Sequence, residues 1–412
     1  MKILNLIFLF ACGLAHANTE NPQIMPLGET EAFMANTGVA EIGSSGSVFF
    51  NPGALATVKS SKISLSGAAY TFFNFKSDSV VRIENKDLSY NADGFNSIPF
   101  SVNSTTKKGE WILALSLMET DMRTYENKVG WETTNYDVKI LQNLSQSEMW
   151  LGGGAARMVS EKVGLGVSAF VLRRIEQVTN TTFVNSKAAP TSDASYTTGR
   201  DQLSLIGFVL LLGGHYTVNE DTQLGMRIRL PMLQFSGNLD SFGSSQLVQG
   251  GVITKVESDQ NGVKAYGQFP ADFAFGVSRR VSSTIRLLAD LGIQMGSDYA
   301  LTDQPASPRF KTNPTARLNT GAEYRLTDNG GIRAGLLYNP SARGALVNEG
   351  EGRLDYFMLT AGYLFQDEHL MTGIGGFYQW SVGEVIPEGA PGSRSAVYTK
   401  AFGAILTTGY VF

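Results

Sequence analysis

The stretch Gln223-Leu-Gly-Met-Arg-Ile-Arg-Leu-Pro-Met232 decides the fold class of this chain. Successive side chains of a β-strand point to opposite faces, so alternate residues share a face. One face of this stretch is apolar and carries Leu224, Met226, Ile228, Leu230 and Met232. The other face carries Arg227 and Arg229. One apolar and one charged face is typical of a strand between lipid and a polar lumen, so the stretch predicts a transmembrane β-strand.

The same alternation recurs along the whole chain. Residues 285–294 and 317–325 also oppose an apolar face to one with arginines or other polar residues. A soluble sandwich also alternates, but it seldom places arginines at successive inner positions. About fourteen such segments follow one another, near 61–76, 95–104, 111–125, 146–159, 162–178, 200–218, 222–238, 262–281, 283–297, 313–327, 330–340, 353–366, 369–383 and 398–412. The sequence therefore predicts an all-β protein, a transmembrane antiparallel β-barrel of about fourteen strands.

The connections between these segments alternate between short and long. The long ones are polar and fall near 77–94, 126–145, 179–199, 239–261, 298–312, 341–352 and 384–397. In outer-membrane barrels the short turns face the periplasm and the long loops face outside. The carboxyl terminus and the start of the first strand both fall on the short-turn side, so both are expected in the periplasm.

The first seventeen residues have the pattern of an export signal. Met1-Lys2 supply a positive start, residues 3–14 form an apolar core, and Ala15-His16-Ala17 offers a cleavage site. The mature chain would then begin at Asn18. An alternative is a lipobox at residues 9–12, with Cys12 lipidated. Cys12 is the sole cysteine, so disulfides and thiolate sites are excluded from the mature protein.

Composition excludes several classes of function. Charged residues make up only 17% and the net charge is −4, which argues against nucleic acid as a partner. The longest apolar run of the mature chain, residues 205–214, is too short for a membrane helix. His215 and His369 stand near no convincing nucleophile, and nucleotide-binding and hydrolase motifs are missing. We therefore expect no catalysis, no cofactor and no metal, with a membrane-barrel hydrolase as the remaining enzymatic alternative.

The final strand has its own signature. Tyr398, Phe402, Leu406, Tyr410 and Phe412 lie on one face, and the chain ends on the last of them. Outer-membrane barrels share such a terminal strand, which the barrel insertion machinery recognises. It predicts that machinery as a partner, outer-membrane lipid around the barrel and location in a Gram-negative outer membrane, with the protein as a monomer.

Residues 18–60 do not follow the strand pattern. They are rich in small residues, yet they contain apolar ones such as Phe33, Phe49 and Phe50. A fourteen-stranded barrel encloses a lumen too wide for side chains alone to fill. We therefore predict a plug at residues 18–60, after a signal peptide at 1–17 and before a barrel at 61–412. A disordered periplasmic tail is the alternative.

Several motifs resemble one known family. The run Phe50-Asn51-Pro52-Gly53-Ala54-Leu55-Ala56 resembles the hatch of the FadL/TodX family of hydrophobic-compound transporters. That family typically reads Asn-Pro-Ala-Gly-Leu-Ala, so Asn51 and Pro52 match and the next two residues are reversed. Three later segments resemble family strands, at Arg229-Leu230-Pro231, at Phe269-Pro270-Ala271-Asp272 followed by Gly276 and Asp290, and at residues 331–338. The resemblance spans residues 30 to 412, and the family's usual opening of the mature chain is missing.

The resemblance implies passive uptake of long-chain fatty acids or similar hydrophobic molecules. Ligand would be captured in an outer groove, pass to a lumen site beside the hatch and leave sideways through the wall. The best groove candidate is the loop 126–145, where a short amphipathic helix would present apolar residues. Its candidate ligand contacts are Trp131, Tyr136, Ile140, Leu141 and Leu144. The alternative is that these residues pin the loop to the rim; loop 239–261 could form the opposite wall.

An anionic head group needs a cation in the lumen, preferably an arginine. Arg229 and Arg317 face inward by alternation and lie away from the periplasmic turns, so they are the candidates. Pairing with lumen acids is the alternative for each arginine. Asn51, Pro52 and Gly53 would give the hatch rigidity, for gating or for anchoring.

The rival prediction is a general diffusion porin or a structural surface barrel. A porin should have an open lumen, whereas a plugged barrel is a poor sieve. The plug therefore favours selective transport.

Overall fold

The computed structural model describes residues 21, 25–83, 86–96, 100–132, 134–187, 193–305, 307–346, 351–387 and 392–412. The predicted signal peptide, with its cleavage site and Cys12, lies outside the described residues. Three short helical turns precede the first strand, namely η2 (Glu31–Met34), α2 (Ser47–Phe50) and η3 (Pro52–Thr57). Among the described residues, no helix is both long and apolar enough to cross a bilayer.

Strands make up almost all the rest of the described chain. The first half contains β1 (Lys62–Ile83), β2 (Lys86–Asn96), β3 (Phe100–Lys108), β4 (Trp111–Glu132), β5 (Tyr136–Met158), β6 (Val163–Ser186), β7 (Ala194–Asn219), β8 (Thr222–Arg229) and β9 (Leu233–Gln249). The second half contains β10 (Val252–Lys264), β11 (Asp272–Arg280), β12 (Ile285–Gln294), β13 (Ser297–Ala300), β14 (Arg309–Thr312), β15 (Thr315–Thr327), β16 (Gly330–Asn339), β17 (Gly352–Gln366), β18 (Leu370–Val385) and β19 (Ser395–Val411).

These strands make fourteen antiparallel crossings within the described chain. Five crossings are interrupted and consist of two strands each, namely β2–β3, β8–β9, β10–β11, β12–β13 and β14–β15. The ladder closes because β1 pairs with β19 over residues 62–77 and 397–411. The predicted fourteen-stranded antiparallel barrel is therefore confirmed. Above the closed ring, β10 pairs only with β9 among the described strands.

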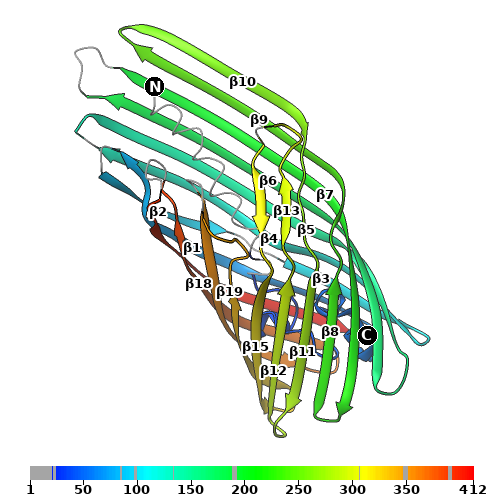
Figure 1. Cartoon of the computed structure of the whole chain (residues 1–412). Helices are drawn as coiled ribbons and strands as arrows, with labels where there is room; N and C mark the ends of the chain where they lie inside the picture. The colour runs from blue at the N-terminus through cyan, green and yellow to red at the C-terminus, as the bar shows by residue number, and fades with distance from the viewer. Residues whose placement is uncertain are drawn as a thin grey trace.

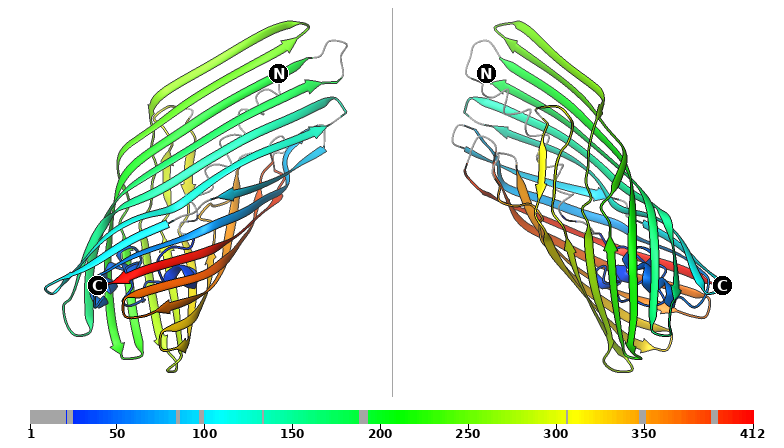
Figure 2. Two further views of the ribbon diagram at one scale, coloured as in Figure 1. Left: turned by 180° about the vertical axis from the view of Figure 1, so that it is seen from behind. Right: turned by 45° about the vertical axis from the view of Figure 1, so that its right-hand side comes forward.

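The barrel wall is much taller on one side than on the other. The long strands β4 to β7, with the β9–β10 hairpin, rise far beyond the upper ends of β16 to β19 (Figure 1, Figure 2). The tall side is tall because most of its predicted loops are continuous strand. These are the segments 77–94, 126–145, 179–199 and 239–261. The expectation of a helix in 126–145 is wrong, since β4 and β5 stay paired up to Glu132 and Asp137.

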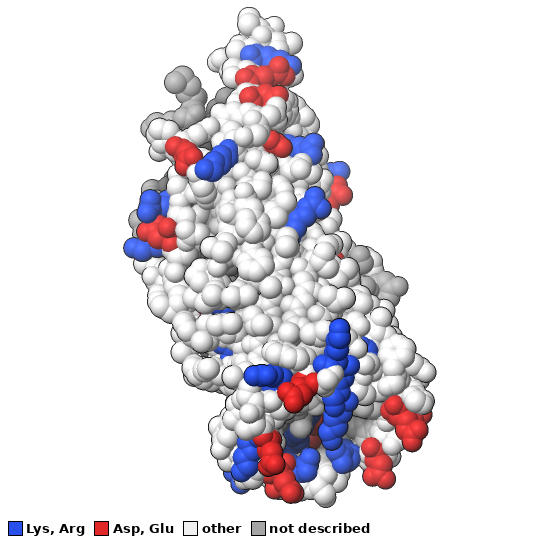
Figure 3. Space-filling view, turned by 90° about the vertical axis from the view of Figure 1, so that its right-hand side faces the viewer, with Lys and Arg blue, Asp and Glu red and all other residues white. Residues whose placement is uncertain are grey.

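The outer surface has the banding of a membrane protein. Charged side chains gather toward both ends of the molecule, and the broad band between them carries few (Figure 3). Large apolar side chains are exposed on the barrel strands, among them Leu115, Leu151, Phe275, Ile374 and Phe402. Exposed apolar side chains around the whole circumference are stable only in contact with hydrocarbon, so the band marks the lipid-facing belt.

The segment before β1 lies inside the lower end of the barrel, where η2, α2 and η3 appear as blue turns (Figure 2). Phe33 and Met34 of η2, Phe49 of α2 and Leu55 of η3 are all buried. The predicted plug in the lumen is therefore confirmed, and residues 25–60 are called the hatch below. The lower lumen is filled, so the expected feature of a porin, an open passage, is missing from the described structure.

Candidate functional site

The hatch turns at Asn51, whose side chain makes three hydrogen bonds. Its Oδ1 accepts from the Gly53 N–H at 3.0 Å, which caps η3, and its Nδ2 donates to the carbonyls of Val39 at 2.6 Å and Gly214 at 3.0 Å. Pro52 occupies the first turn of η3, where its fixed φ suits a helix start. Asn51 thus ties two parts of the hatch to strand β7.

The wall beside this turn is lined by glycines. A Cβ at Gly166 would lie 2.2 Å from the Pro52 carbonyl oxygen, and one at Gly213 would lie 2.4 Å from the Gly53 nitrogen. A Cβ at Gly225 would lie 1.9 Å from the carbonyl oxygen of Val39. The hatch backbone therefore lies directly on the strand backbones, and only glycine leaves room for it. We call Gly166, Gly213 and Gly225 the glycine seat.

Two further contacts hold the middle of the hatch. Phe33 and Met34 pack against glycines of β15 to β18, where a Cβ at Gly335 would lie 2.2 Å from the Met34 carbonyl carbon. Asp290 of β12 accepts hydrogen bonds from the main-chain N–H groups of Gly38 at 2.7 Å and Val39 at 2.9 Å. The lumen acid Asp290 thus binds the hatch backbone.

Where the hatch packs against the wall, the lumen contains a closely packed aromatic cluster. Phe49 of α2 meets Trp150 of β5 edge-on, with ring centroids 5.5 Å apart, and Trp150 meets Phe170 of β6 at 5.7 Å. Phe269, in the segment between β10 and β11, reaches Trp150 at 6.4 Å. Leu172, Val209 and Leu211 belong to the same buried cluster. We call Phe49, Trp150, Phe170 and Phe269 with these aliphatic neighbours the chamber.

Three arginines and one aspartate line the edge of the chamber. Asp272 forms ion pairs with Arg227 and with Arg317, the latter through two hydrogen bonds of 2.6 and 3.1 Å. Arg227 also lies over the ring of Phe49, at 5.9 Å from its centroid. A bidentate pair uses the guanidinium face that would bind a ligand carboxylate. Arg317 therefore follows the alternative in the sequence analysis, pairing with a lumen acid.

Arg229 differs from its two neighbours. It is only 4% exposed, and its Nη2 donates a hydrogen bond to the Pro270 carbonyl at 3.2 Å. Its Nε has no hydrogen-bond partner among the described residues. A buried guanidinium without a bidentate acceptor has free donors for an anion. Of the two predicted head-group residues, Arg229 alone has this capacity.

The predicted groove residues lie near the upper ends of β4 and β5. Trp131 and Tyr136 pack against a cluster of Val138, Ile140 and Val184, and Leu144 packs against Val178. Leu141 does not share this inner face, because strand alternation turns it to the opposite side. Val138 and Ile140 are two residues apart, which is the spacing of residues on one face of a strand. The prediction of a helical loop did not take this spacing into account.

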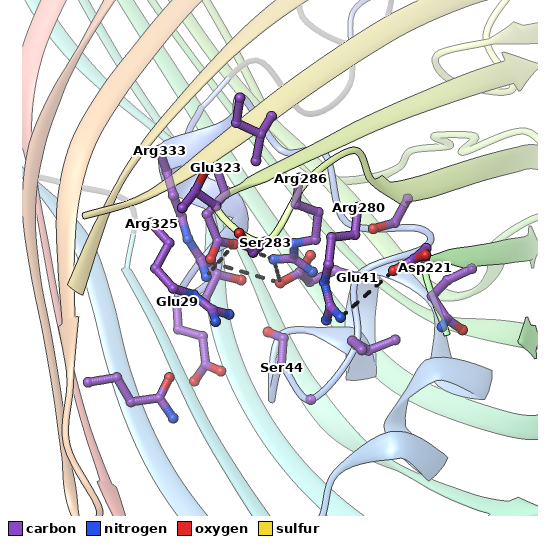
Figure 4. Close-up of a pocket in the computed structure, with 18 of the residues that line it drawn as sticks. Glu29, Glu41, Ser44, Asp221, Arg280, Ser283, Arg286, Glu323, Arg325 and Arg333 are labelled. Atoms are coloured by element: carbon purple, nitrogen blue, oxygen red, sulfur yellow. Dashed lines mark hydrogen bonds and ion pairs between the residues drawn. The ribbon is translucent and has the colours of Figure 1, made fainter. Parts of the chain in front are cut away.

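Below the hatch lies a charged cavity of about 280 Å³, which we call the vestibule. Hatch residues Glu29 and Glu41 face strand cations across it (Figure 4). Glu41 pairs with Arg286 at 2.9 Å, and Arg286 also pairs with Glu323 at 2.6 Å. Arg333 binds Glu323 at 3.1 Å and approaches Glu41 at 4.0 Å, while Glu29 pairs with Lys62. Arg286 and Arg333 thus follow the alternative in the sequence analysis, in which arginines of the lumen pair with acids.

Sequence reasoning missed Trp150, Phe170 and Phe269 as members of one site. Trp150 and Phe170 occupy inward positions of β5 and β6, which alternation can identify. Phe269 lies in the interruption between β10 and β11. Trp150 and Phe170 lie on the paired strands β5 and β6, but Phe49 and Phe269 come from distant parts of the chain, and periodicity does not show that they meet there. Gly164 and Gly166 of β6 lie directly against the hatch, since a Cβ at Gly164 would stand 2.7 Å from the Gly53 carbonyl oxygen.

Comparison of the fold with solved structures finds channels of one kind. A FadL homologue from Pseudomonas aeruginosa has a TM-score of 0.64 and 14% identity, over 95% of this chain and 99% of that one. The toluene transporter TodX from Pseudomonas putida has a TM-score of 0.63 and 12% identity, over 94% of this chain and 99% of that one. The toluene transporter TbuX from Ralstonia pickettii has 0.55 and 14%, over 96% and 99%.

Comparison by sequence gives no such match, since no family model and no curated protein matches this chain. Identity of 14% or less supports a statement about the fold only. Fold, strand number and hatch position nevertheless agree with the resemblance found in the motifs. The chain therefore has the plugged, fourteen-stranded barrel fold of the FadL- and TodX-type channels.

Proposed function

We propose that this protein carries hydrophobic compounds passively across a Gram-negative outer membrane, with long-chain fatty acids as the ligand class. The observation that carries the proposal is Arg229 at the edge of the apolar chamber, a buried cation whose Nε has no hydrogen-bond partner among the described residues. An alkyl chain in the chamber and a carboxylate on Arg229 would satisfy both surfaces. Burial of an apolar chain contributes roughly 25 cal/mol per Å².

The neighbouring proteins support the broader part of this proposal. Two of the matched structures are toluene transporters and another is a monoaromatic hydrocarbon channel, so this fold carries apolar cargo in those proteins. The aromatic chamber suits a neutral hydrocarbon as well, and Arg229 is the feature that favours an acid. Ligand would reach the chamber along the inner face of β4 to β7, past Trp131, Tyr136, Ile140 and Leu144.

The proposal extends to export and assembly. We propose residues 1–17 as a cleaved signal, and recognition of the terminal strand ending at Phe412 by the barrel insertion machinery.

The described residues contain no group of histidine, cysteine and acidic side chains suited to a metal. The proposal needs none, because transport down a gradient requires binding surfaces and no chemical step.

The test compares two ligands and two variants. Purified protein is titrated with radiolabelled palmitate and with toluene, and Arg229→Met is compared with Arg325→Met, an exposed arginine of the vestibule. Hydrogen bonds to a charged group contribute about 1.5–3 kcal/mol. Arg229→Met should therefore weaken palmitate binding by roughly 10- to 100-fold and leave toluene binding unchanged. Arg325→Met should change neither affinity.

Two results would overturn the proposal. Equal palmitate affinity in wild type and Arg229→Met would remove the assignment of a fatty acid and leave an apolar ligand. Free passage of small sugars through the intact protein, without saturable binding of either ligand, would favour the porin. Deletion of residues 18–56 should by contrast open a path for those sugars.

A further inference from the structure

The hairpin formed by β13 and β14 stands apart from the barrel sheet. Its two strands pair with each other over four residues and form a separate two-stranded sheet. Isolated bridges at Ala265–Thr302 and Thr312–Arg343 are its ladder contacts with the rest of the described barrel. In Figure 1 the yellow strands stand steeply across the slanted strands of the tall wall. The hairpin is thus attached to the wall far more weakly than its neighbours are.

The end of the hairpin lies on the lumen face of the tall wall. Leu301 and Phe310 belong to one apolar cluster with Leu203, Leu205 and Leu239. Leu203 and Leu205 alternate in phase with the chamber residues Val209 and Leu211 along β7, so they face the lumen higher up. The hairpin therefore covers the lumen above the chamber, on the side from which ligand arrives.

The base of the hairpin has the composition of a hinge. Both legs break at the same height, at Met295-Gly296 and at Asn313-Pro314. A Cβ at Gly296 would lie 2.5 Å from the Thr312 carbonyl oxygen, so the legs cross closely. Pro314 has no N–H and cannot continue the ladder. Rotation at this level would break few hydrogen bonds.

Few polar contacts hold the far end in place. The Tyr266 N–H donates to the Leu301 carbonyl at 2.8 Å, and its hydroxyl donates to Asp303 at 2.8 Å. Gln304 Nε2 also donates to Gln260 Oε1 of β10, at 3.3 Å. The cluster of Leu301 and Phe310 with Leu203 and Leu205 adds an apolar contact. If the hairpin swung away in water, Leu203, Leu205 and Leu301 would be exposed together, which is unfavourable. An apolar molecule that covered them would offset that cost, whereas a polar solute would not.

We propose that the hairpin of β13 and β14, residues 297–305 and 307–312, forms a lid over the chamber that opens for apolar ligands and closes against polar solutes. An arriving apolar ligand takes the place of Leu301 and Phe310 on Leu203 and Leu205 and then moves down to the chamber. The selection for apolar cargo is made at this contact. This inference rests on the proposed function, and it adds the place at which access is controlled.

The test locks the lid with a disulfide. Ala265 and Thr302 are bridge partners, and residues opposed in an antiparallel bridge have Cα atoms about 4.5–5.5 Å apart, within the range of a disulfide. Ala265→Cys with Thr302→Cys should therefore crosslink on oxidation. Gln246→Cys with Lys255→Cys is the matched control, because these residues pair in the β9–β10 hairpin and bridge no moving part.

Uptake of labelled palmitate and of toluene is measured in intact cells, and equilibrium palmitate binding is measured on the purified proteins. Oxidation of the lid pair should reduce uptake of both ligands by about tenfold or more, and a reductant should restore it. Equilibrium affinity should be unchanged, because the chamber is intact. The control pair should behave as wild type in both states.

Normal uptake by the crosslinked lid pair would overturn the lid. Reduced affinity of the crosslinked protein would also overturn it, since the hairpin would then belong to the binding site. Absence of saturable binding in wild type would instead contradict the proposed function. The three outcomes are therefore distinguishable.

Discussion

Two of the contacts that hold the hatch, the glycine seat and the vestibule, differ in physical character. At the glycine seat, backbone atoms of Val39, Pro52 and Gly53 lie directly on strands β6 to β8, and the contacts are neutral. At the vestibule, Glu29 and Glu41 reach cations of the wall across a solvent-filled cavity. The first contact depends on shape, and the second depends on charge.

This difference indicates which part of the hatch can be released. Close backbone packing is insensitive to salt and pH, and it fails only when a side chain intrudes. Ion pairs beside water weaken with ionic strength. Arg286 and Glu323 remain 18% and 17% exposed, so water reaches this contact. We therefore expect the vestibule side to move first and the glycine seat to act as the fixed end.

The largest expected effect comes from intrusion into the glycine seat. In Gly213→Ala the new methyl group would stand 2.3 Å from Asn51 Oδ1 and 2.4 Å from the Gly53 nitrogen, and backbone atoms cannot retreat easily. Overpacking of this kind costs about 3 kcal/mol at the upper end of its usual range, so the hatch should leave its seat. Small-sugar permeation through reconstituted barrels should rise well above that of wild type.

Gly214→Ala is the matched control, because its Cβ would meet only Leu165 Cδ2, at 3.8 Å. This neighbour should fold and permeate as wild type does. If Gly213→Ala also stayed sealed, with normal heat-modifiable migration, the seat would not be what positions the hatch.

The second prediction removes charge at the vestibule. Glu41→Gln loses the pair with Arg286 but leaves Glu323 bound to both Arg286 and Arg333. Because Glu323 still compensates the arginines, we expect a loss of about 2 kcal/mol in hatch docking, below the cost of breaking an isolated buried pair. Ser47→Cys is a suitable reporter, since Ser47 is fully buried and its hydroxyl has no partner among the described residues.

Alkylation of the Ser47→Cys thiol should be faster in the Glu41→Gln background than in wild type. High salt should accelerate it in wild type and have little further effect in Glu41→Gln. Glu220→Gln, another acid of the vestibule, is the control and should leave the rate unchanged. A rate independent of both Glu41 and salt would contradict an electrostatic seat.

The contrast between the two seats also explains what the sequence could predict. Alternation depends on one strand at a time, so fourteen strands, their orientation and the inward arginines followed from residues such as Leu224 to Arg229. Small residues and Asn51-Pro52 predicted a plug. Each of these features depends on a short stretch of the chain, so the order of residues within that stretch is enough to predict it.

Pairwise partners could not be predicted in the same way. Arg229 and Arg317 look equivalent by alternation, yet only Arg317 stands where Asp272 can bind it through both oxygens. That choice depends on the register of β8, β11, β12 and β15. The prediction of a helix in residues 126–145 was wrong for a different reason. Apolar residues there are spaced two apart, as on one face of a strand, and they belong to β5.

The smallest expected effect is a dependence on pH at Glu31 of the hatch. Burial raises the pKa of Glu31 to about 7, and the nearby charges of Glu29 and Glu41 add to it. Burial alone would also raise the pKa of Glu29, but Lys62 lowers it below its ordinary value, so Glu29 keeps its charge. Ser44 and the Thr30 N–H are the neutral groups that bind the Glu31 carboxylate. Protonation of Glu31 therefore relieves a cluster of buried acids.

A carboxyl whose pKa is raised on docking stabilises the docked hatch fully below its ordinary pKa near 4.5, and loses that effect as the pH rises through 7. Between pH 6 and 8 the docked hatch should lose about 1 kcal/mol. Alkylation of Ser47→Cys, divided by the rate for the unfolded protein at each pH, should rise severalfold over this interval. Glu31→Gln should abolish the rise and hold the rate near its pH 6 value, because glutamine is neutral throughout. An equal rise of the alkylation rate in Glu31→Gln would assign the pH dependence to another group. A rate that falls as the pH increases would contradict a raised pKa of Glu31 in the docked hatch.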